Sequence, residues 1–291
     1  KLGHGSSALD AVWGAKRTMA NIEGQELVMG TRRPIIEVKN LRKEYPVLDE
    51  TVVALERINL TIPQGQICCI YGESGSGKST LLNQLAGLEK PTRGHVEICG
   101  VNISRLSERQ LAVFRQKHIG FVFQFHQLLP EFTALENVMI GRHTRSHAGA
   151  VSSVLRLPKM KKEESEIAHK AYELLQYVGI EDVVDEKAIN LSYGHQRRLE
   201  IARALACEPK LLALDEPAAG MNPSETEGLK HLMSKIRDDG VTILLIEHDV
   251  KLMMELCDRI AVLDYGQKIA EGLPEEVQQN PAVLEAYLGG I

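Results

Sequence analysis

The chain has 291 residues, of which 44% are hydrophobic and 25% are charged, and its formal net charge is −5. This length suits one sizeable domain with appended parts, and the acidic balance argues against a nucleic-acid surface as the main interface. No apolar run approaches the ~18 residues that span a bilayer. The five cysteines show no metal-ligand spacing and are expected to be reduced thiols.

The first half of the chain opens with an irregular segment and continues with strand patterns. Residues 1–34 fit no regular pattern, so we expect a flexible N-terminal extension there, with a docking helix as the alternative. Residues 35–63 alternate as antiparallel strands do, and residues 93–103 read as a further hairpin. Together these segments predict an antiparallel β-lobe.

A complete phosphate-binding loop, G-x-x-x-x-G-K-[ST], lies between these strand segments. An apolar, β-prone run over residues 66–71 precedes it, and a helical pattern over residues 81–88 follows. A strand, a glycine loop and a helix start in this order aim backbone N–H groups at an anion, which a chance Gly/Ser-rich turn would not do. The pattern therefore predicts nucleoside triphosphate binding by Gly72, Glu73, Ser74, Gly75, Ser76, Gly77, Lys78, Ser79 and Thr80. Lys78 is expected on the β- and γ-phosphates, and the Ser79 hydroxyl on Mg²⁺.

Polar side chains follow three further apolar runs. Gln124 comes after residues 120–123, and Asp215 and Glu216 come after four apolar residues in a row. Carboxylate and amide oxygens at such strand ends suit Mg²⁺, and Glu216 is placed to act as a general base. Each of these residues also has an alternative interpretation without function. Gln124 alone could be an ordinary glutamine at the end of a strand, and Asp215 and Glu216 could cap the next helix. His248 follows the run 241–246, where a lone histidine is more often a satisfied core group.

A second candidate anion site precedes another helix. Ser192 and Gly194 lie just before a strongly amphipathic pattern over residues 197–206. They are therefore expected to sit before a helix N-terminus, where backbone N–H groups and the helix dipole favour negative charge. One chain cannot easily use both anion sites on one nucleotide.

In this order and with these intervals, the motifs resemble those of the ATP-binding cassette (ABC) ATPases, over about residues 35–288. The resemblance implies an α/β fold: a P-loop (RecA-like) nucleotide-binding core with an antiparallel β-lobe and an inserted α-helical lobe at about residues 126–195. Residues 35–291 would then form one ABC ATPase domain. ATP and Mg²⁺ are the implied cofactors, with no nucleic acid as a partner.

The resemblance also implies roles for single residues. Glu216, His248 and Gln124 would be catalytic, as general base, switch histidine and γ-phosphate sensor, and the implied metal ligands are Ser79, Gln124 and Asp215. Tyr45 lies where this family places an aromatic ring on the adenine; a strand-end tyrosine before a proline turn is the alternative.

In the family, the second anion site closes over the ATP held by a partner's phosphate loop. Ser192 and Gly194 would therefore bind nucleotide in a head-to-tail dimer, formed with a second copy or a paralogue. Tyr193 and His195 depart from the family's Leu-Ser-Gly-Gly-Gln, and Asn222 replaces a common aspartate. The Asn222 exchange is expected to alter coupling between the two sites and to leave ATP binding intact.

The two halves of the chain resemble different branches of the family. Residues 120–139 resemble the lipoprotein-releasing and macrolide-exporter branch, whereas the chain from residue 141 onward resembles the branched-chain amino-acid importer branch. A natural mosaic, an engineered hybrid and a divergent lineage all remain open.

The resemblance implies an ATP-hydrolysing subunit that powers separate integral-membrane permease subunits at the cytoplasmic face of the inner or plasma membrane. The expected substrate is branched-chain amino acids, and lipoprotein release or macrolide-type export is the alternative. A soluble non-transport ABC-type ATPase is a weaker hypothesis, because the chain has neither tandem cassettes nor long coiled-coil inserts.

Overall fold

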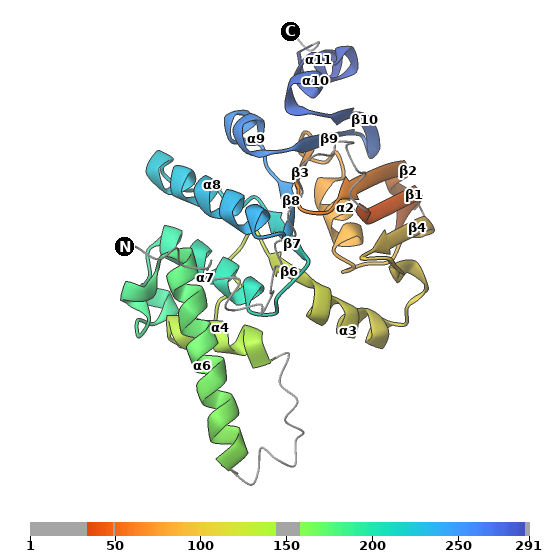
Figure 1. The fold of residues 1–291 in the computed structure, drawn as a ribbon. Helices are drawn as coiled ribbons and strands as arrows, with labels where there is room; N and C mark the ends of the chain where they lie inside the picture. The colour runs from red at the N-terminus through yellow and green to blue at the C-terminus, as the bar shows by residue number, and fades with distance from the viewer. Residues whose placement is uncertain (1–33, 49, 144–157, 289–291) are drawn as a thin grey trace, which may run out of the picture.

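The computed structural model describes residues 34–48, 50–143 and 158–288, which build two sheets with helices around them (Figure 1). The extension expected over residues 1–34 lies outside the described residues, except for Pro34. A four-stranded sheet has the order β2-β1-β4-β5, and a six-stranded sheet has the order β10-β9-β3-β8-β7-β6.

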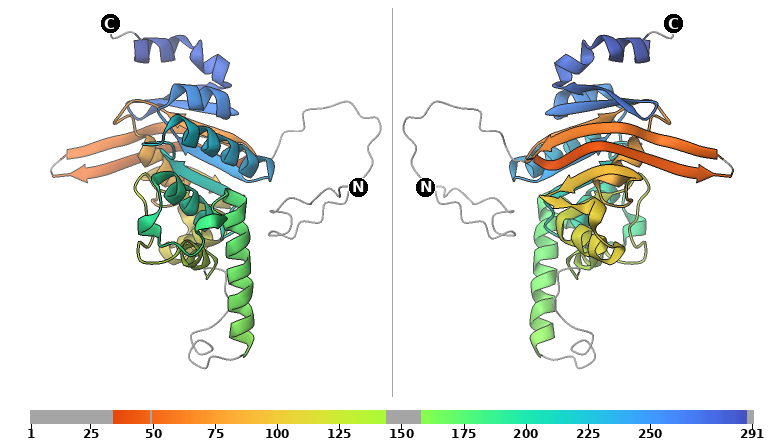
Figure 2. Two further views of the ribbon diagram at one scale, coloured as in Figure 1. Left: turned by 90° about the vertical axis from the view of Figure 1, so that its left-hand side faces the viewer. Right: turned by 90° about the vertical axis from the view of Figure 1, so that its right-hand side faces the viewer.

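The smaller sheet is the expected antiparallel β-lobe. Its strands are β1 (Pro34–Val47), β2 (Glu50–Pro63), β4 (Arg93–Ile98) and β5 (Val101–Asn102). All three pairings in it are antiparallel. Figure 2 shows β1 and β2 as a long pair that reaches out from the body of the molecule. Alternate residues such as Ile36 and Val38 are buried, which explains the period of two in the sequence.

The larger sheet is mostly parallel and forms the centre of the molecule. Its strands are β3 (Ile67–Tyr71), β6 (Ile119–Val122), β7 (Leu211–Asp215), β8 (Thr242–Ile246), β9 (Arg259–Asp264) and β10 (Gln267–Gly272). Only the β9–β10 hairpin is antiparallel. The central strands are buried on both faces, which is why the sequence shows continuous apolar runs there instead of alternation.

Two hydrophobic clusters cover the two faces of this sheet. Cys68 and Ile70 of β3 pack in the cluster that contains the buried leucines of α2 (Lys78–Leu85). Cys69, between them, packs in the cluster that contains Leu199 of α7 (Tyr193–Leu205). Because successive side chains of a strand point to opposite faces, α2 and α7 cover opposite faces of the sheet.

The remaining helices distribute over these two faces. α3 (Glu108–His118) joins the α2 face. The α7 face carries α4 (Ala134–His143), α6 (Pro158–Val178), α8 (Pro223–Asp238), α9 (Val250–Leu256), α10 (Pro274–Gln278) and α11 (Pro281–Leu288). Short 3₁₀ turns occur at Ile103–Arg105, Glu181–Val183 and Ala188–Asn190. Within the described ranges, no helix combines the length and apolarity needed to cross a membrane.

The helices α4, α6 and α7 pack on one another and form the helical lobe between β6 and β7 (Figure 1). Their place in chain order confirms a helical insertion in an α/β core with an antiparallel β-lobe beside it.

Candidate functional site

The candidate site lies at one edge of the six-stranded sheet. The phosphate loop follows β3, Gln124 follows β6, Asp215 ends β7, and His248 follows β8. These four strands are consecutive neighbours in the order β3-β8-β7-β6 and are mutually parallel. Their carboxyl ends therefore meet at the same edge, where open α/β sheets bind ligands.

The phosphate loop wraps around the Lys78 ammonium. Lys78 Nζ donates to the carbonyl oxygens of Gly72 at 2.7 Å and Glu73 at 2.8 Å. A Cβ on Gly72 would lie 2.5 Å from Leu263 O, and a Cβ on Gly77 would lie 2.8 Å from Ala54 O. Both approaches are shorter than real Cβ contacts, so only glycine fits at these positions.

Donor groups remain available inside the loop. Gly77 is the N-cap of α2 with φ of 100°, and no side chain of the described residues caps the N-terminus of this helix. The Ser76 hydroxyl is buried and finds no hydrogen-bond partner among the described residues. An uncapped helix start beside a buried, unpartnered hydroxyl suits an anionic ligand, because a phosphate oxygen would satisfy both.

Gln124, Glu216 and His248 meet at the same point. Gln124 Nε2 donates to Glu216 Oε2 at 2.9 Å, and His248 Nδ1 lies 3.9 Å from the same oxygen. The His248 side chain is 65% exposed, which is not the environment of a core histidine. Glu216 has a φ of 46°, and its backbone N–H donates to Ile246 O at 3.0 Å. A non-glycine residue held in this region is strained, and such strain clusters at functional sites.

Asp215 is a partly buried carboxylate beside that cluster. Burial raises its pKa, the neighbouring Glu216 carboxylate raises it further, and the positive charges of Lys78 and Arg197 act in the opposite direction. The site thus holds two adjacent carboxylates within electrostatic range of the phosphate-loop lysine. Oxygen donors of this kind are the ligands that Mg²⁺ prefers.

Tyr45 lies against the start of α2. Its hydroxyl donates to Glu89 Oε2 at 2.7 Å, and Lys43 Nζ lies 4.9 Å from the ring centroid. Burial and the Glu89 carboxylate raise the pKa of Tyr45, while a hydrogen bond with Thr80 of the phosphate loop acts the other way. The structure therefore brings Tyr45 to the loop that is expected to hold the nucleotide.

Ser192 and Gly194 stand apart from this cluster. Ser192 is the N-cap of α7, where its hydroxyl accepts from His195 N at 3.3 Å. Gly194 lies within the first turn of the helix and not before it, so that part of the expectation was wrong. A Cβ there would lie 2.7 Å from Glu225 Oε1, which explains the need for glycine. Since α7 and α2 cover opposite faces of the sheet, one chain separates the two candidate anion sites.

Two family models match this chain. One, described as ABC transporter, matches residues 55–219, and the other, described as branched-chain amino acid ATP-binding cassette transporter, matches residues 267–290. The chain belongs to the ABC transporter family. It is an ATP-binding ATPase subunit of that family.

Relatives of this ABC ATPase match along most of its length. The high-affinity branched-chain amino acid transport ATP-binding proteins BraF of Pseudomonas aeruginosa and LivG of Escherichia coli K12 are each 38% identical, over 88% of this chain and 98% of their own. The methionine import ATP-binding protein MetN of Mannheimia succiniciproducens is 39% identical, over 85% of this chain and 67% of its own.

Solved structures of ABC cassettes share the fold. A dimeric post-hydrolysis state of the cassette MJ0796 with ADP and Pi is 33% identical, with a TM-score of 0.72 over 82% of this chain and 98% of its own. The ADP conformation of MJ1267 is 31% identical, with a TM-score of 0.73 over 88% of this chain and 99% of its own.

Two site residues of the ABC ATPase, Glu247 and Arg197, are not predicted by its sequence. Glu247 is 1% exposed, and its carboxylate accepts from Ala218 N at 3.0 Å and from His248 N at 3.2 Å. It thereby ties the loop after Glu216 to the loop that carries His248. Arg197 is completely buried, although the amphipathic pattern of its helix assigns arginines to the solvent face. Neither position has a local sequence signal that could have revealed it.

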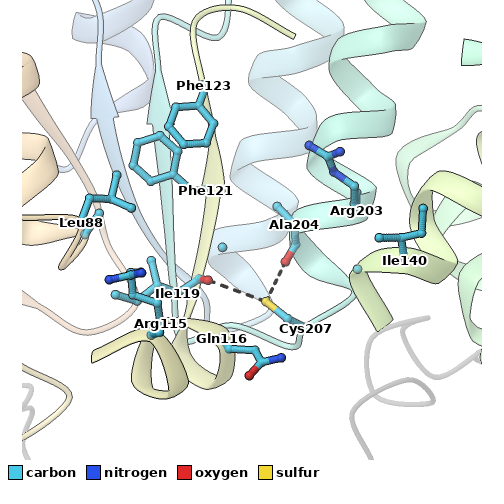
Figure 3. Close-up of a pocket in the computed structure, with 14 residues that line it drawn as sticks. Leu88, Arg115, Gln116, Ile119, Phe121, Phe123, Ile140, Arg203, Ala204 and Cys207 are labelled. Atoms are coloured by element: carbon cyan, nitrogen blue, oxygen red, sulfur yellow. Dashed lines mark hydrogen bonds between the residues drawn. The ribbon is translucent and has the colours of Figure 1, made fainter. Parts of the chain in front are cut away.

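A groove opens where the core of the ABC ATPase meets its helical lobe (Figure 3). This lobe groove has a cavity volume of about 430 Å³ and lies between α3, β6, α4 and α7. Its lining is mostly apolar, with Phe121 and Phe123 on one side and Ile140 on another (Figure 3). The remaining lining residues are Ala86, Leu88, Ala112, Arg115, Gln116, Ile119, Gly120, Gly141, Arg203, Ala204 and Cys207.

Proposed function

We propose that this chain powers the import of branched-chain amino acids. The observation that carries the proposal is the match of residues 267–290 to the branched-chain amino acid cassette model, together with relatives of that name over 88% of the chain. The importer-like half identified in the sequence includes this C-terminal segment.

The geometry of the site supports a division of labour among its residues. Residues 72–80 hold the phosphates of ATP, with Lys78 on the β- and γ-phosphates and Tyr45 stacked on the adenine. The oxygens of Ser79, Gln124 and Asp215 form the donor set for Mg²⁺, which would neutralise phosphate charge. In this proposal Glu216 accepts the proton of the attacking water, and His248 keeps that water in line.

The separation of Ser192 from the phosphate loop supports action as a dimer. Both regions are fit to bind phosphate, yet they flank opposite faces of one sheet. In a head-to-tail pair, Ser192 and Gly194 of each copy would cover the nucleotide held by the other copy. The related cassette MJ0796 is described as dimeric in two solved structures.

The lobe groove is the proposed contact with the integral-membrane permease subunits. It is concave and mostly apolar, as the docking site of a partner segment is expected to be. The ATPase would then lie peripherally at the cytoplasmic face of the membrane. Ile140 is a groove residue suited to test this contact, because it is 38% exposed and lies on α4, away from Glu216.

One observation favours the alternative function, export by the lipoprotein-releasing or macrolide type. Gly120, Phe121 and Phe123 of the lobe groove come from the exporter-like segment, whereas Arg203 and Cys207 come from the importer-like part. Because both the exporter-like and the importer-like segments line the groove, the permease that binds there decides the direction of transport.

The experiment is to isolate the chain from membranes together with its permease subunits and to reconstitute the complex in lipid vesicles. We expect ATP-dependent uptake of leucine, isoleucine or valine. Lipoprotein release without uptake of these amino acids would contradict the proposal and favour the alternative. Ile140→Ser should abolish copurification of the permease and preserve ATP hydrolysis, whereas Ile189→Ser, outside the groove and 58% exposed, should change neither.

A further inference from the structure

Side chains of helix α7 form hydrogen bonds with the backbone of the segment that carries Gln124. Arg197 donates to the carbonyl oxygens of Phe123 at 2.7 Å and Gln124 at 3.0 Å. Three residues on, Glu200 Oε1 accepts from Gln127 N at 2.8 Å, and three further on, Arg203 donates to Gln127 O at 2.6 Å. These three side chains (Arg197, Glu200 and Arg203, together the α7 clamp) are about one turn apart and occupy the same face of the helix.

The centre of the α7 clamp is a buried ion pair. Arg197 Nη1 and Glu200 Oε2 lie 2.9 Å apart, with side chains 0% and 1% exposed. Glu200 Oε2 also lies 2.8 Å from His126 Nδ1. A buried pair of this kind roughly breaks even against well-packed apolar side chains, so overall stability does not explain its presence. What it does provide is a fixed position for residues 123–127 relative to α7.

The α7 clamp connects the two anion-binding regions of the chain. At one end, Ser192 caps α7, and Arg197 Nη2 donates to the hydroxyl of Tyr193 at 3.2 Å. At the other end, the side chain of Gln124, whose carbonyl Arg197 holds, donates to Glu216 at 2.9 Å. A displacement of the α7 N-terminus is thus carried by hydrogen bonds to the candidate general base.

We propose that Arg197 is a positioning residue, which sets Gln124 against Glu216 according to the position of α7. When the nucleotide of the partner copy engages Ser192, the α7 clamp would realign Gln124 at this chain's own nucleotide. The inference rests on the dimer of the proposed function and adds a route within each chain by which its two half-sites communicate. It makes ATP hydrolysis cooperative without any contact between Arg197 and ATP.

The first test removes one hydrogen bond from the clamp. Tyr193→Phe deletes the hydroxyl that Arg197 contacts, and Tyr172→Phe is a matched control because both tyrosines are 38% exposed. Loss of one such bond predicts a fall in kcat of about three- to tenfold and a lower Hill coefficient for ATP, with nucleotide affinity unchanged. The control should match the wild type. Unchanged kcat and cooperativity in Tyr193→Phe would overturn the proposal.

The second test removes the ion pair. Arg197→Gln alone would leave Glu200 as an unpaired buried charge and threaten folding, so Arg197→Gln and Glu200→Gln are combined. The folded double variant should bind a fluorescent ATP analogue normally, lose about tenfold or more in kcat, and have a Hill coefficient near one. A folded double variant with wild-type kcat and cooperativity would overturn the proposal. If the double variant does not fold, the result for Tyr193→Phe alone decides whether the proposal holds. Hydrolysis by wild-type monomers would instead contradict the proposed dimer, and this inference with it.

Discussion

Glu216 is the side chain on which the proposed chemistry depends most directly. Its carboxylate is contacted by Gln124 at 2.9 Å and faced by His248 at 3.9 Å, at a strained backbone position. A strand-end acidic residue that only caps a helix needs neither neighbour. The arrangement fits a carboxylate that is held ready to accept a proton.

Replacement of this base should separate ATP binding from turnover. We expect Glu216→Gln to lower the rate of phosphate release by about 10²- to 10⁴-fold, keep ATP binding, and accumulate an ATP-bound dimer. Phosphate release and size-exclusion chromatography with ATP measure the two effects. Glu131→Gln is a control, because Glu131 is exposed and, among the described residues, forms an ion pair with Lys187 alone. Full hydrolysis by Glu216→Gln would remove Glu216 from its proposed role.

The raised pKa of Asp215 predicts how the stability of the folded chain depends on pH. Because burial and Glu216 raise its pKa, the folded chain binds this proton more tightly than the unfolded chain does. The favourable contribution is therefore present at low pH and is lost as pH rises through the raised pKa. Without Mg²⁺, Asp215→Asn should have a higher melting temperature than the wild type at pH 7, and the gap should shrink as pH falls. A wild type that is the more stable protein at pH 7 would contradict this.

Among the secondary-structure elements, the α2 N-terminus shows how tightly the phosphate loop is built. Gly77 has a φ of 100°, and a Cβ there would lie 2.8 Å from Ala54 O in β2. Gly100 has a φ of 78°, but beyond its two chain neighbours no atom of the described residues lies within 4 Å of a Cβ placed on it. Both positions strain an alanine, and only the first also forces two backbone segments apart.

Alanine at these two glycines should therefore give different results. Gly100→Ala should lose about 1–2 kcal/mol of unfolding free energy from strain alone and bind ATP normally. Gly77→Ala should lose more and should also bind ATP weakly, because the loop must shift. Chemical denaturation and ATP titration measure both quantities. Equal stabilities with equal ATP affinities would show that the contact between the loop and β2 does not matter.

The elements were largely predictable because their patterns are local. Continuous apolar runs at β3, β7 and β8 and a complete loop motif before α2 leave little room for another fold. The burial of Arg197 was not predictable. A helical pattern places an arginine toward solvent, and the carbonyl groups that accept its hydrogen bonds come from residues 123 and 124, which are distant in the sequence. Gly194 inside the first turn and Glu216 at positive φ depend in the same way on packing partners far away in the chain.

For the whole molecule, the decisive feature is the sheet that separates α2 from α7. Because the sheet lies between them, the phosphate loop and Ser192 of one chain cannot both contact the phosphates of one nucleotide. The α7 clamp and the lobe groove share Arg203, so the proposed contact to the partner copy and the proposed contact to the permease meet on one helix. In this proposal, the shared helix is the physical route by which ATP-driven pairing would act on a membrane subunit.

A mixing experiment tests the paired site most directly. Lys78→Ala removes the phosphate-loop lysine, and Ser192→Asp keeps an N-cap residue on α7 but places a negative charge where the partner's phosphate would bind. Each variant alone should be inactive. A mixed dimer contains one intact site, built from Lys78 of one copy and Ser192 of the other, so random pairing in an equal mixture sets an upper limit of about a quarter of the wild-type ATPase rate. The copy with the intact loop carries the Ser192→Asp substitution and has lost the signal through its own α7 clamp, so we expect the recovered rate to lie below this limit and clearly above the sum of the two inactive variants. A mixture whose dimers form but whose rate stays at the sum of the two inactive variants would contradict the composite site.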